Sequence, residues 1–214
     1  VTEKGIAEYH QGNSAYNKKK YSEAIDYFKQ SIVTLNASEK KAGHKDERGG
    51  GGHTHGQQKR LDKKEWLFFN HTYSGFSYHL LGRENESITS FNRVKDLIKK
   101  YKDPEMITGL FSALMLNIYQ MRQTKEATAF FSAFGKEINK LPRTTELAYF
   151  YSLAGLLYSD QKDYKNALPH YTKQIEILTE LGNSLIKHGQ NEKGRKYLDR
   201  AREIKMKTSV RNPD

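Results

Sequence analysis

A short pattern of small and aromatic residues recurs along this chain and constrains its fold more than any other feature. In the first copy, residues 12–35, two amphipathic segments flank a break made of three consecutive lysines. Gly12 and Ala24 allow two antiparallel helices to approach closely, and aromatic residues such as Phe28 fill the space around them. A helix pair of this kind has a face that it cannot bury alone, so it requires stacked copies of itself.

The rest of the chain supplies these copies as further pairs of amphipathic segments. Pro169 falls in the first turns of its segment, where few backbone hydrogen bonds are lost, so we expect the helix to continue through it. The last copy is compressed, and we expect residues 164–188 to form one helix that is continuous or kinked near Gly182. The expected repeats are residues 4–36, 65–101, 105–141, 145–178 and 179–207. The sequence therefore predicts a single all-α domain over residues 1–207, followed by a frayed tail at residues 208–214. Within the first repeat, Ser22 is the expected N-cap of the second helix.

Residues 37–62 interrupt the pattern and predict a flexible, disordered insertion after the first repeat. This stretch has no apolar periodicity and contains four consecutive glycines, which lose much conformational entropy on ordering. His44, His53 and His55 lie here, but a glycine tether does not supply the rigid further ligands that a metal site needs. We therefore expect no metal site.

The order of the recurring residues resembles the tetratricopeptide repeat family. The spacing between Ala127 and its counterpart Ala167 is 40 residues, longer than the family's repeat of about 34. Lengthened repeats resemble those of cargo adaptors, cell-polarity scaffolds and bacterial peptide-sensing regulators. The resemblance implies an α-solenoid, a right-handed superhelix of about five antiparallel helix pairs. In each of the five copies, five residues occupy the recurring positions of the family pattern. They are Gly12, Ala15, Tyr21, Ala24 and Phe28; Gly75, Tyr78, Glu84, Ser87 and Phe91; Met115, Ile118, Thr124, Ala127 and Phe131; Gly155, Tyr158, Tyr164, Ala167 and Tyr171; and Gly182, Leu185, Asn191, Gly194 and Leu198.

No motif of enzyme chemistry is present, so we expect a non-enzymatic protein without a cofactor. The absence of cysteine excludes disulfides, thiolate zinc sites and a cysteine nucleophile. The run of glycines precedes no Lys-Ser/Thr pair, and neither a G-x-S-x-G elbow nor an H-E-x-x-H pair occurs. No apolar run approaches the length of a membrane span, and no export signal is visible, so a cytoplasmic location is expected. Val1 is not a start methionine, so a leader or further domain could precede it.

The resemblance also implies a binding groove lined by the first helix of each pair. Exposed tyrosine and phenylalanine side chains in such a groove would anchor a peptide segment or helix of a partner protein. A receptor for chaperone tails is disfavoured, because Asn13 matches that subtype while Tyr9, Tyr73, Gly109 and Ala113 occupy its other binding positions. The expected groove residues are Tyr9, Asn13, Tyr16, Asn17, Phe76, His79, Tyr119, Tyr149 and Leu156.

The basic charge of the chain supports an alternative function. Lys and Arg number 36 against 25 Asp and Glu, a net charge of +11, which favours acidic proteins, nucleic acid or an anionic membrane. Aromatic residues interleave poorly with the basic clusters, which disfavours specific single-strand recognition. Our main hypothesis is a scaffold or adaptor for complex assembly, whose groove binds a peptide segment or helix of another protein. An acidic partner, a peptide-sensing regulator and self-association through a terminal repeat stay open. The basic residues considered are Lys59, Arg60, Lys63, Lys64, Lys193, Arg195, Lys196, Arg200 and Arg202.

Overall fold

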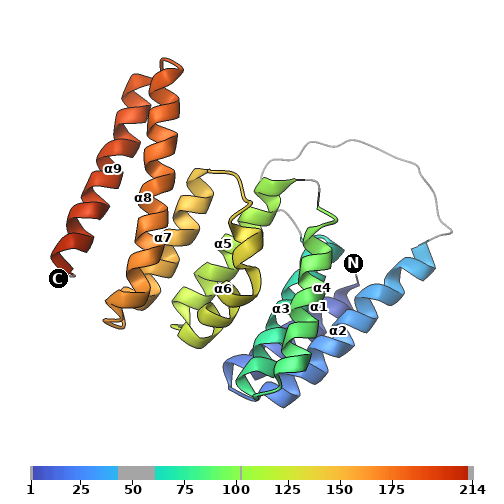
Figure 1. Ribbon diagram of the computed structural model, residues 1–214. Helices are drawn as coiled ribbons and strands as arrows, with labels where there is room; N and C mark the ends of the chain where they lie inside the picture. Colours follow the sequence, from blue (N-terminus) through green and yellow to red (C-terminus); the bar gives the residue numbers. More distant parts are fainter. Residues whose placement is uncertain (1, 43–60, 102, 212–214) are drawn as a thin grey trace. The chain divides into compact units, whose positions relative to one another are not determined.

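A computed structural model describes residues 2–42, 61–101 and 103–211, and all secondary structure in these residues is helical. This confirms the predicted all-α fold. The chain divides into two compact units, Val1–Lys100 and Tyr101–Asp214. Figure 1 labels the helices of each unit. Most of the predicted insertion, residues 43–60, lies outside the described residues.

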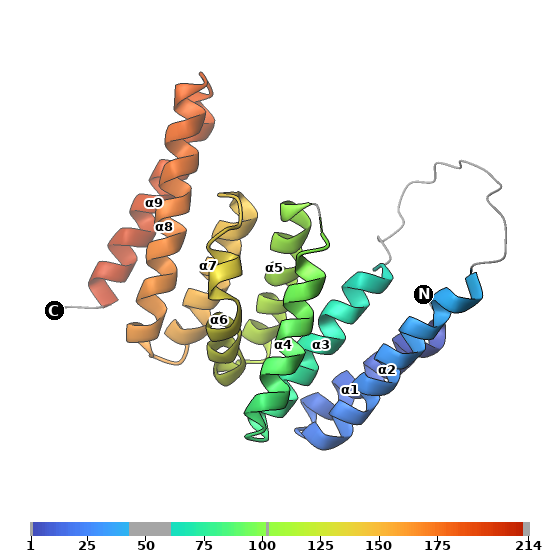
Figure 2. The ribbon, with the colours of Figure 1, turned by 45° about the vertical axis from the view of Figure 1, so that its right-hand side comes forward.

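The first unit contains two antiparallel helix pairs (Figure 2). They are α1 (Glu3–Asn17) with α2 (Tyr21–Ala42), and α3 (Lys63–Leu80) with α4 (Glu84–Ile98). Ser22 was predicted to be the N-cap of α2. Because the helix starts at Tyr21, Ser22 lies inside its first turn, and this prediction was wrong. The helix also continues to Ala42, into the stretch predicted as an insertion. Asp62 caps α3 by accepting a hydrogen bond from the Glu65 backbone N–H at 2.8 Å, and this capping box fixes where α3 begins.

The second unit contains α5 (Pro104–Gln120), α6 (Thr124–Ile138), α7 (Thr145–Ser159), α8 (Tyr164–Lys187) and α9 (Asn191–Arg211). As predicted, α8 runs unbroken through Pro169 and past Gly182. It packs against α7 and also against α9, which lies beside it in Figures 1 and 2. The last helix continues beyond Lys207 to Arg211, into the segment predicted as a tail. In both units the first helices of successive pairs are also in contact, α1 with α3 and α5 with α7, as in a solenoid.

Five turns with the same backbone geometry join the helices of each pair. In each turn, the residue two positions before the second helix has a positive φ: Lys19, Gly82, Arg122, Lys162 and Gly189. The next backbone N–H donates to the carbonyl five residues earlier, as in Lys20 to Ala15 (3.0 Å) and Gln190 to Leu185 (2.9 Å). This hydrogen bond is characteristic of the Schellman motif that ends helices. The compressed fifth copy therefore turns in the same way as the other four.

Three of these turns hold the left-handed conformation with a residue other than glycine, which predicts a route to higher stability. Replacing Lys19, Arg122 and Lys162 with glycine should raise the free energy of unfolding by about 0.5–1 kcal/mol each, because glycine carries no Cβ penalty there. Urea denaturation of the triple variant tests this. In the reverse direction, Gly82→Ala should destabilise by about 1 kcal/mol, and a stabilising Gly82→Ala would contradict the argument.

Glycine in the first helix and an aromatic ring in the second set the spacing of three pairs. A Cβ placed at Gly12 would lie 2.6 Å from the Phe28 ring, one at Gly75 2.5 Å from Phe91, and one at Gly155 2.7 Å from Tyr171. These distances are too short for any real Cβ, so the aromatic rings pack directly on the glycine backbone.

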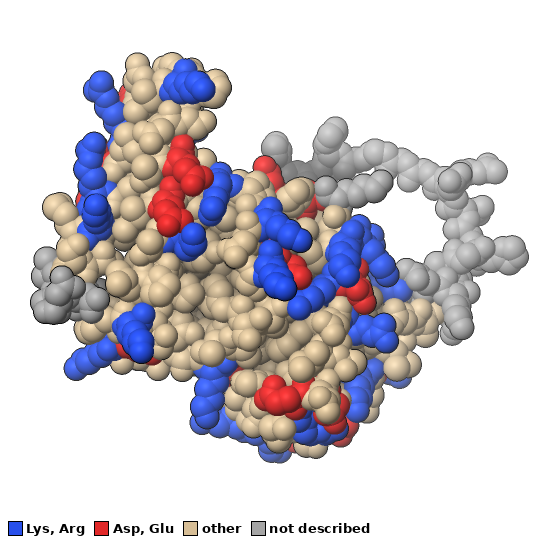
Figure 3. Space-filling model, in the orientation of Figure 1, with Lys and Arg blue, Asp and Glu red and all other residues tan. Residues whose placement is uncertain are grey.

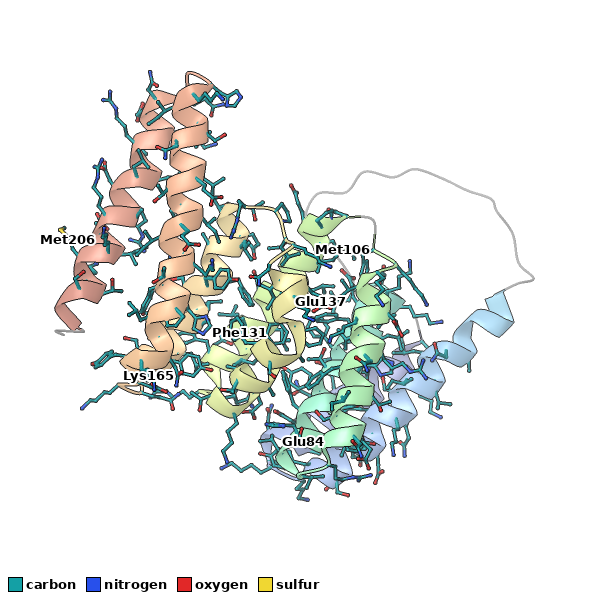
Figure 4. The ribbon with its side chains drawn as sticks, in the orientation of Figure 1. Glu84, Met106, Phe131, Glu137, Lys165 and Met206 are labelled. Atoms are coloured by element: carbon teal, nitrogen blue, oxygen red, sulfur yellow. The ribbon has the colours of Figure 1, made fainter. Side chains whose placement is uncertain are left out.

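The third pair departs from this arrangement because Met115 occupies the glycine position. The backbones of α5 and α6 lie further apart than those of the other pairs, and Phe111 on α5 packs between them against Phe130, with ring centroids 5.1 Å apart. Phe131, the counterpart of Phe28, contacts the next pair instead: its ring centroid lies 5.5 Å from Phe150 and 4.4 Å from His170 (Figure 4).

Candidate functional site

Three residues of the first unit that were predicted to anchor a partner are buried in the structure. Tyr9, Tyr16 and Phe76 are 6%, 1% and 0% exposed, so they belong to the core. Tyr16 packs edge-on against Tyr73 at 5.2 Å, which closes the space between α1 and α3. The expectation that these three rings are exposed anchors was wrong, since they fill the space between packed helices.

The other predicted groove residues of the first unit remain accessible. Asn13 is half-buried and Asn17 is exposed on α1. His79 on α3 is also half-buried, and its Nδ1 lies 2.9 Å from a carboxylate oxygen of Glu84, across the turn to α4. Their role in binding a partner stays a prediction.

In the second unit, α7, α8 and α9 enclose a cavity of about 240 Å³. Leu156 on α7 lines it, as expected for a groove residue, and so does Ser152 one turn earlier. Residues of α9, the helix that carries most of the predicted basic patch, complete the lining. The lining comprises three apolar residues (Leu156, Tyr171 and Ile204), three polar residues (Ser152, Gln174 and Thr208) and three charged residues (Arg200, Glu203 and Lys207).

Gln174 is the most unusual residue of this lining. Its side chain is only 6% exposed, and its buried Oε1 has no hydrogen-bond partner among the described residues. Burying an amide oxygen without a partner is destabilising, and folded proteins rarely leave one in that state. No local sequence pattern points to Gln174, because its surroundings form only when α9 packs along α8.

The charged residues of the lining differ in their pairing. Arg200 lies 3.6 Å from Glu203 in an exposed ion pair, which contributes little to stability. Lys207 makes no ion pair with any described residue. The Thr208 hydroxyl donates to the backbone oxygen of Ile204 at 3.0 Å, so its remaining lone pair can accept from a ligand. The cavity thus combines an apolar wall, an unsatisfied amide and an unpaired cation.

Two further predicted groove residues lie on α5 and α7. Tyr149 is 44% exposed on α7, the same helix that carries Leu156. The Tyr119 hydroxyl on α5 donates to a carboxylate oxygen of Asp160 at 3.2 Å. Partial burial raises the pKa of Tyr119, and the neighbouring negative charge of Asp160 raises that pKa further.

One family model matches the chain: the tetratricopeptide repeat, over residues 148–177. This span contains most of α7 and the first half of α8, including Gly155 and Tyr171. Residues 148–177 therefore form a tetratricopeptide repeat. No curated protein and no solved structure matches it at a significant level. Within this repeat α7 is the first helix, and it is also the helix that carries Leu156 at the cavity.

The residues of the predicted basic patch lie in different parts of the chain. Lys59 and Arg60 lie outside the described residues, and Lys63 and Lys64 begin α3 in the first unit. The other five, Lys193, Arg195, Lys196, Arg200 and Arg202, are exposed on α9 in the second unit. Figure 3 shows Lys and Arg atoms along α9, with Asp and Glu atoms nearby over α8.

Carboxylates accompany several of the α9 cations and lower their joint field. Lys196 lies 3.0 Å from Glu192, and Arg202 lies 2.6 Å from Asp199. Within the described residues, no group of three or more His, Cys, Asp or Glu could hold a metal ion. None of the helices in that part of the chain is both long and apolar enough to span a bilayer.

Proposed function

We propose that this protein is a non-enzymatic interaction scaffold that binds a peptide segment of a partner protein along α7. Tetratricopeptide repeats form stacked helix pairs whose concave faces serve as binding surfaces, which indicates a protein-interaction role. The observation that carries the proposal is the cavity of about 240 Å³ beside Leu156, on the first helix of the matched repeat.

The residues along α7 suit the recognition of a peptide. Tyr149 offers an exposed aromatic ring with few rotatable bonds, so it can bury a large area at low entropic cost. Leu156 opens into the cavity two turns further along the helix, where a partner side chain would lose its contact with water. Tyr119 on the neighbouring α5, held by its hydrogen bond to Asp160, extends this surface within the same unit.

Replacing Tyr149 with alanine should weaken the binding of peptides selected from a random library by about fivefold or more, because a truncated aromatic anchor costs over about 1 kcal/mol. The free energy of unfolding should change by less than about 0.5 kcal/mol, since the ring is exposed. Fluorescence anisotropy with labelled selected peptides measures the affinity. Leu168→Ala, at a similarly exposed apolar residue of α8 outside the cavity, is the matched control. Equal affinities for the wild type and Tyr149→Ala would contradict the groove assignment.

Nucleic acid or an anionic membrane is the competing partner, and salt separates it from a peptide. Binding through phosphate contacts would weaken steeply between about 0.05 and 0.2 M salt, since each contact adds close to one unit to the log–log slope. The affinity for a peptide held mainly by Tyr149 and Leu156 would depend far less on the salt concentration. Three of the α9 cations are paired with carboxylates, which weakens the attraction to a polyphosphate chain but leaves the helix with a net positive charge.

A further inference from the structure

We propose that the cavity between α7, α8 and α9 is a subsite for an internal acidic segment of the partner. In this subsite, a main-chain peptide group of the partner hydrogen-bonds the Gln174 amide, and an apolar side chain packs on Leu156 and Ile204. An adjacent Asp or Glu carboxylate binds Lys207 and Arg200. This inference rests on the function proposed above and specifies the chemistry of the partner at one end of that surface.

The Gln174 amide points to a ligand with both a donor and an acceptor. Its Oε1 is buried and lacks a partner in the described part of the chain, and an amide group also carries two N–H donors. A buried amide of this kind is destabilising until a ligand supplies the missing hydrogen bonds. A peptide group supplies an N–H and a C=O together, so a main chain running past Gln174 satisfies the amide whichever way it is oriented.

The remaining lining separates an apolar base from a charged rim. Leu156, Tyr171 and Ile204 provide apolar surface within the cavity. At the rim, Arg200 is 62% exposed and shares its charge with Glu203, whereas Lys207 makes no ion pair among the described residues. A ligand carboxylate at this rim would be attracted by two cations, Arg200 and Lys207, and repelled by one carboxylate, Glu203.

The charge of α9 favours the same ligand. The helix carries eight Lys and Arg residues against three Asp and Glu residues, which raises the local concentration of acidic segments. The position of the cations at the rim indicates a carboxylate on a side chain. A terminal carboxylate supplies only acceptors and would leave the Gln174 amide oxygen without a donor, whereas an internal peptide group supplies both. The outward face of α9, which presents Met206 to solvent, takes no part (Figure 4).

Selection from two random peptide libraries tests the proposal with the full chain. In one library, 12-residue peptides are displayed with both ends blocked, and in the other they end in a free carboxyl terminus. The blocked library should yield binders with Asp or Glu next to an aliphatic or aromatic residue. Selection only from the library with free termini, or binders without acidic residues, would overturn the proposal.

Two substitutions then connect the selected peptides to this cavity. Gln174→Leu should lower the peptide affinity about tenfold while leaving the unfolding midpoint equal to that of the wild type or higher, because it removes an unsatisfied amide. Lys207→Glu should lower the affinity about tenfold, whereas Lys205→Glu, which changes the net charge equally on exposed α9 outside the cavity lining, should change it less than twofold. Equal effects of the two lysine substitutions, or an affinity unchanged by Gln174→Leu, would refute the subsite.

Failure of this inference is distinguishable from failure of the proposed function. If Tyr149→Ala lowers the peptide affinity but Gln174→Leu and Lys207→Glu do not, the proposed binding along α7 is supported and the acidic subsite is refuted. Absence of binders from both libraries, or binders indifferent to Tyr149→Ala, would remove the proposed function and the subsite with it.

Discussion

Replacing Gly194 with alanine is expected to lower the free energy of unfolding by about 2 kcal/mol and to disrupt the α9 side of the cavity. A Cβ at Gly194 would lie 2.6 Å from the Gly182 carbonyl oxygen and 2.6 Å from the Ile186 Cγ1 atom. The first of these atoms belongs to the backbone of α8, so relief requires the two helices to move apart. Because Ile204 and Lys207 also lie on α9, this movement should weaken peptide binding. Urea denaturation followed by circular dichroism measures the stability, and fluorescence anisotropy measures the binding.

Gly109→Ala is the matched control for this substitution. Gly109 lies within α5, and a Cβ there would have no atom within 4 Å. The same chemical change should therefore stabilise the protein by about 0.5–1 kcal/mol, since alanine is the better helix former. If Gly194→Ala also stabilised the protein, the close contact between α8 and α9 would be refuted.

Lowering the pH from 6.5 to 4 is expected to remove about 3 kcal/mol of stability through His170 alone. Burial lowers the pKa of His170 from the usual 6.5 to about 4. Its ring stacks on Tyr158, with centroids 5.5 Å apart and planes within 8°, and lies close to Phe131. The folded state thus favours the neutral ring, while the unfolded chain binds a proton below pH 6.5. The stabilisation is complete above pH 6.5 and is lost as the pH falls toward 4, at about 1.4 kcal/mol per pH unit.

His170→Phe separates this effect from other titrations. The substitution keeps an aromatic ring against Tyr158 and Phe131 but removes the protonation. Denaturation curves measured from pH 8 to pH 4 give the free energy of unfolding of both proteins. Between pH 6.5 and pH 4 this free energy should fall less steeply for His170→Phe than for the wild type, by the contribution of one proton, and at pH 8 the two values should be similar. His71 on α3 contributes its own dependence, because burial and the charge of Arg93 lower the pKa of His71 to about 4. Identical slopes for the wild type and His170→Phe would show that His170 is not buried as described.

The candidate site was only partly predictable from the sequence. Leu156 and Tyr149 were expected from the position of α7 in its repeat, and the structure places the first at a cavity and the second at the surface. Tyr16 and Phe76 were expected in the same groove, yet both are buried. A helical position tells which residues share a face, but whether that face meets solvent or another helix depends on the packing of the neighbouring pair.

The sequence by itself determined the helices, their turns and the glycine contacts that set their spacing. These depend on interactions within a few tens of residues, such as Gly155 against Tyr171 or the turn at Gly189. Only the tertiary structure decided what α9 does. The helix that carries most of the predicted basic patch packs closely along α8 at Gly182 and Gly194, and it brings Lys207 to the cavity that contains Gln174 and Leu156. These residues come from three helices, so no local pattern records their proximity; close packing of the backbones brings them together.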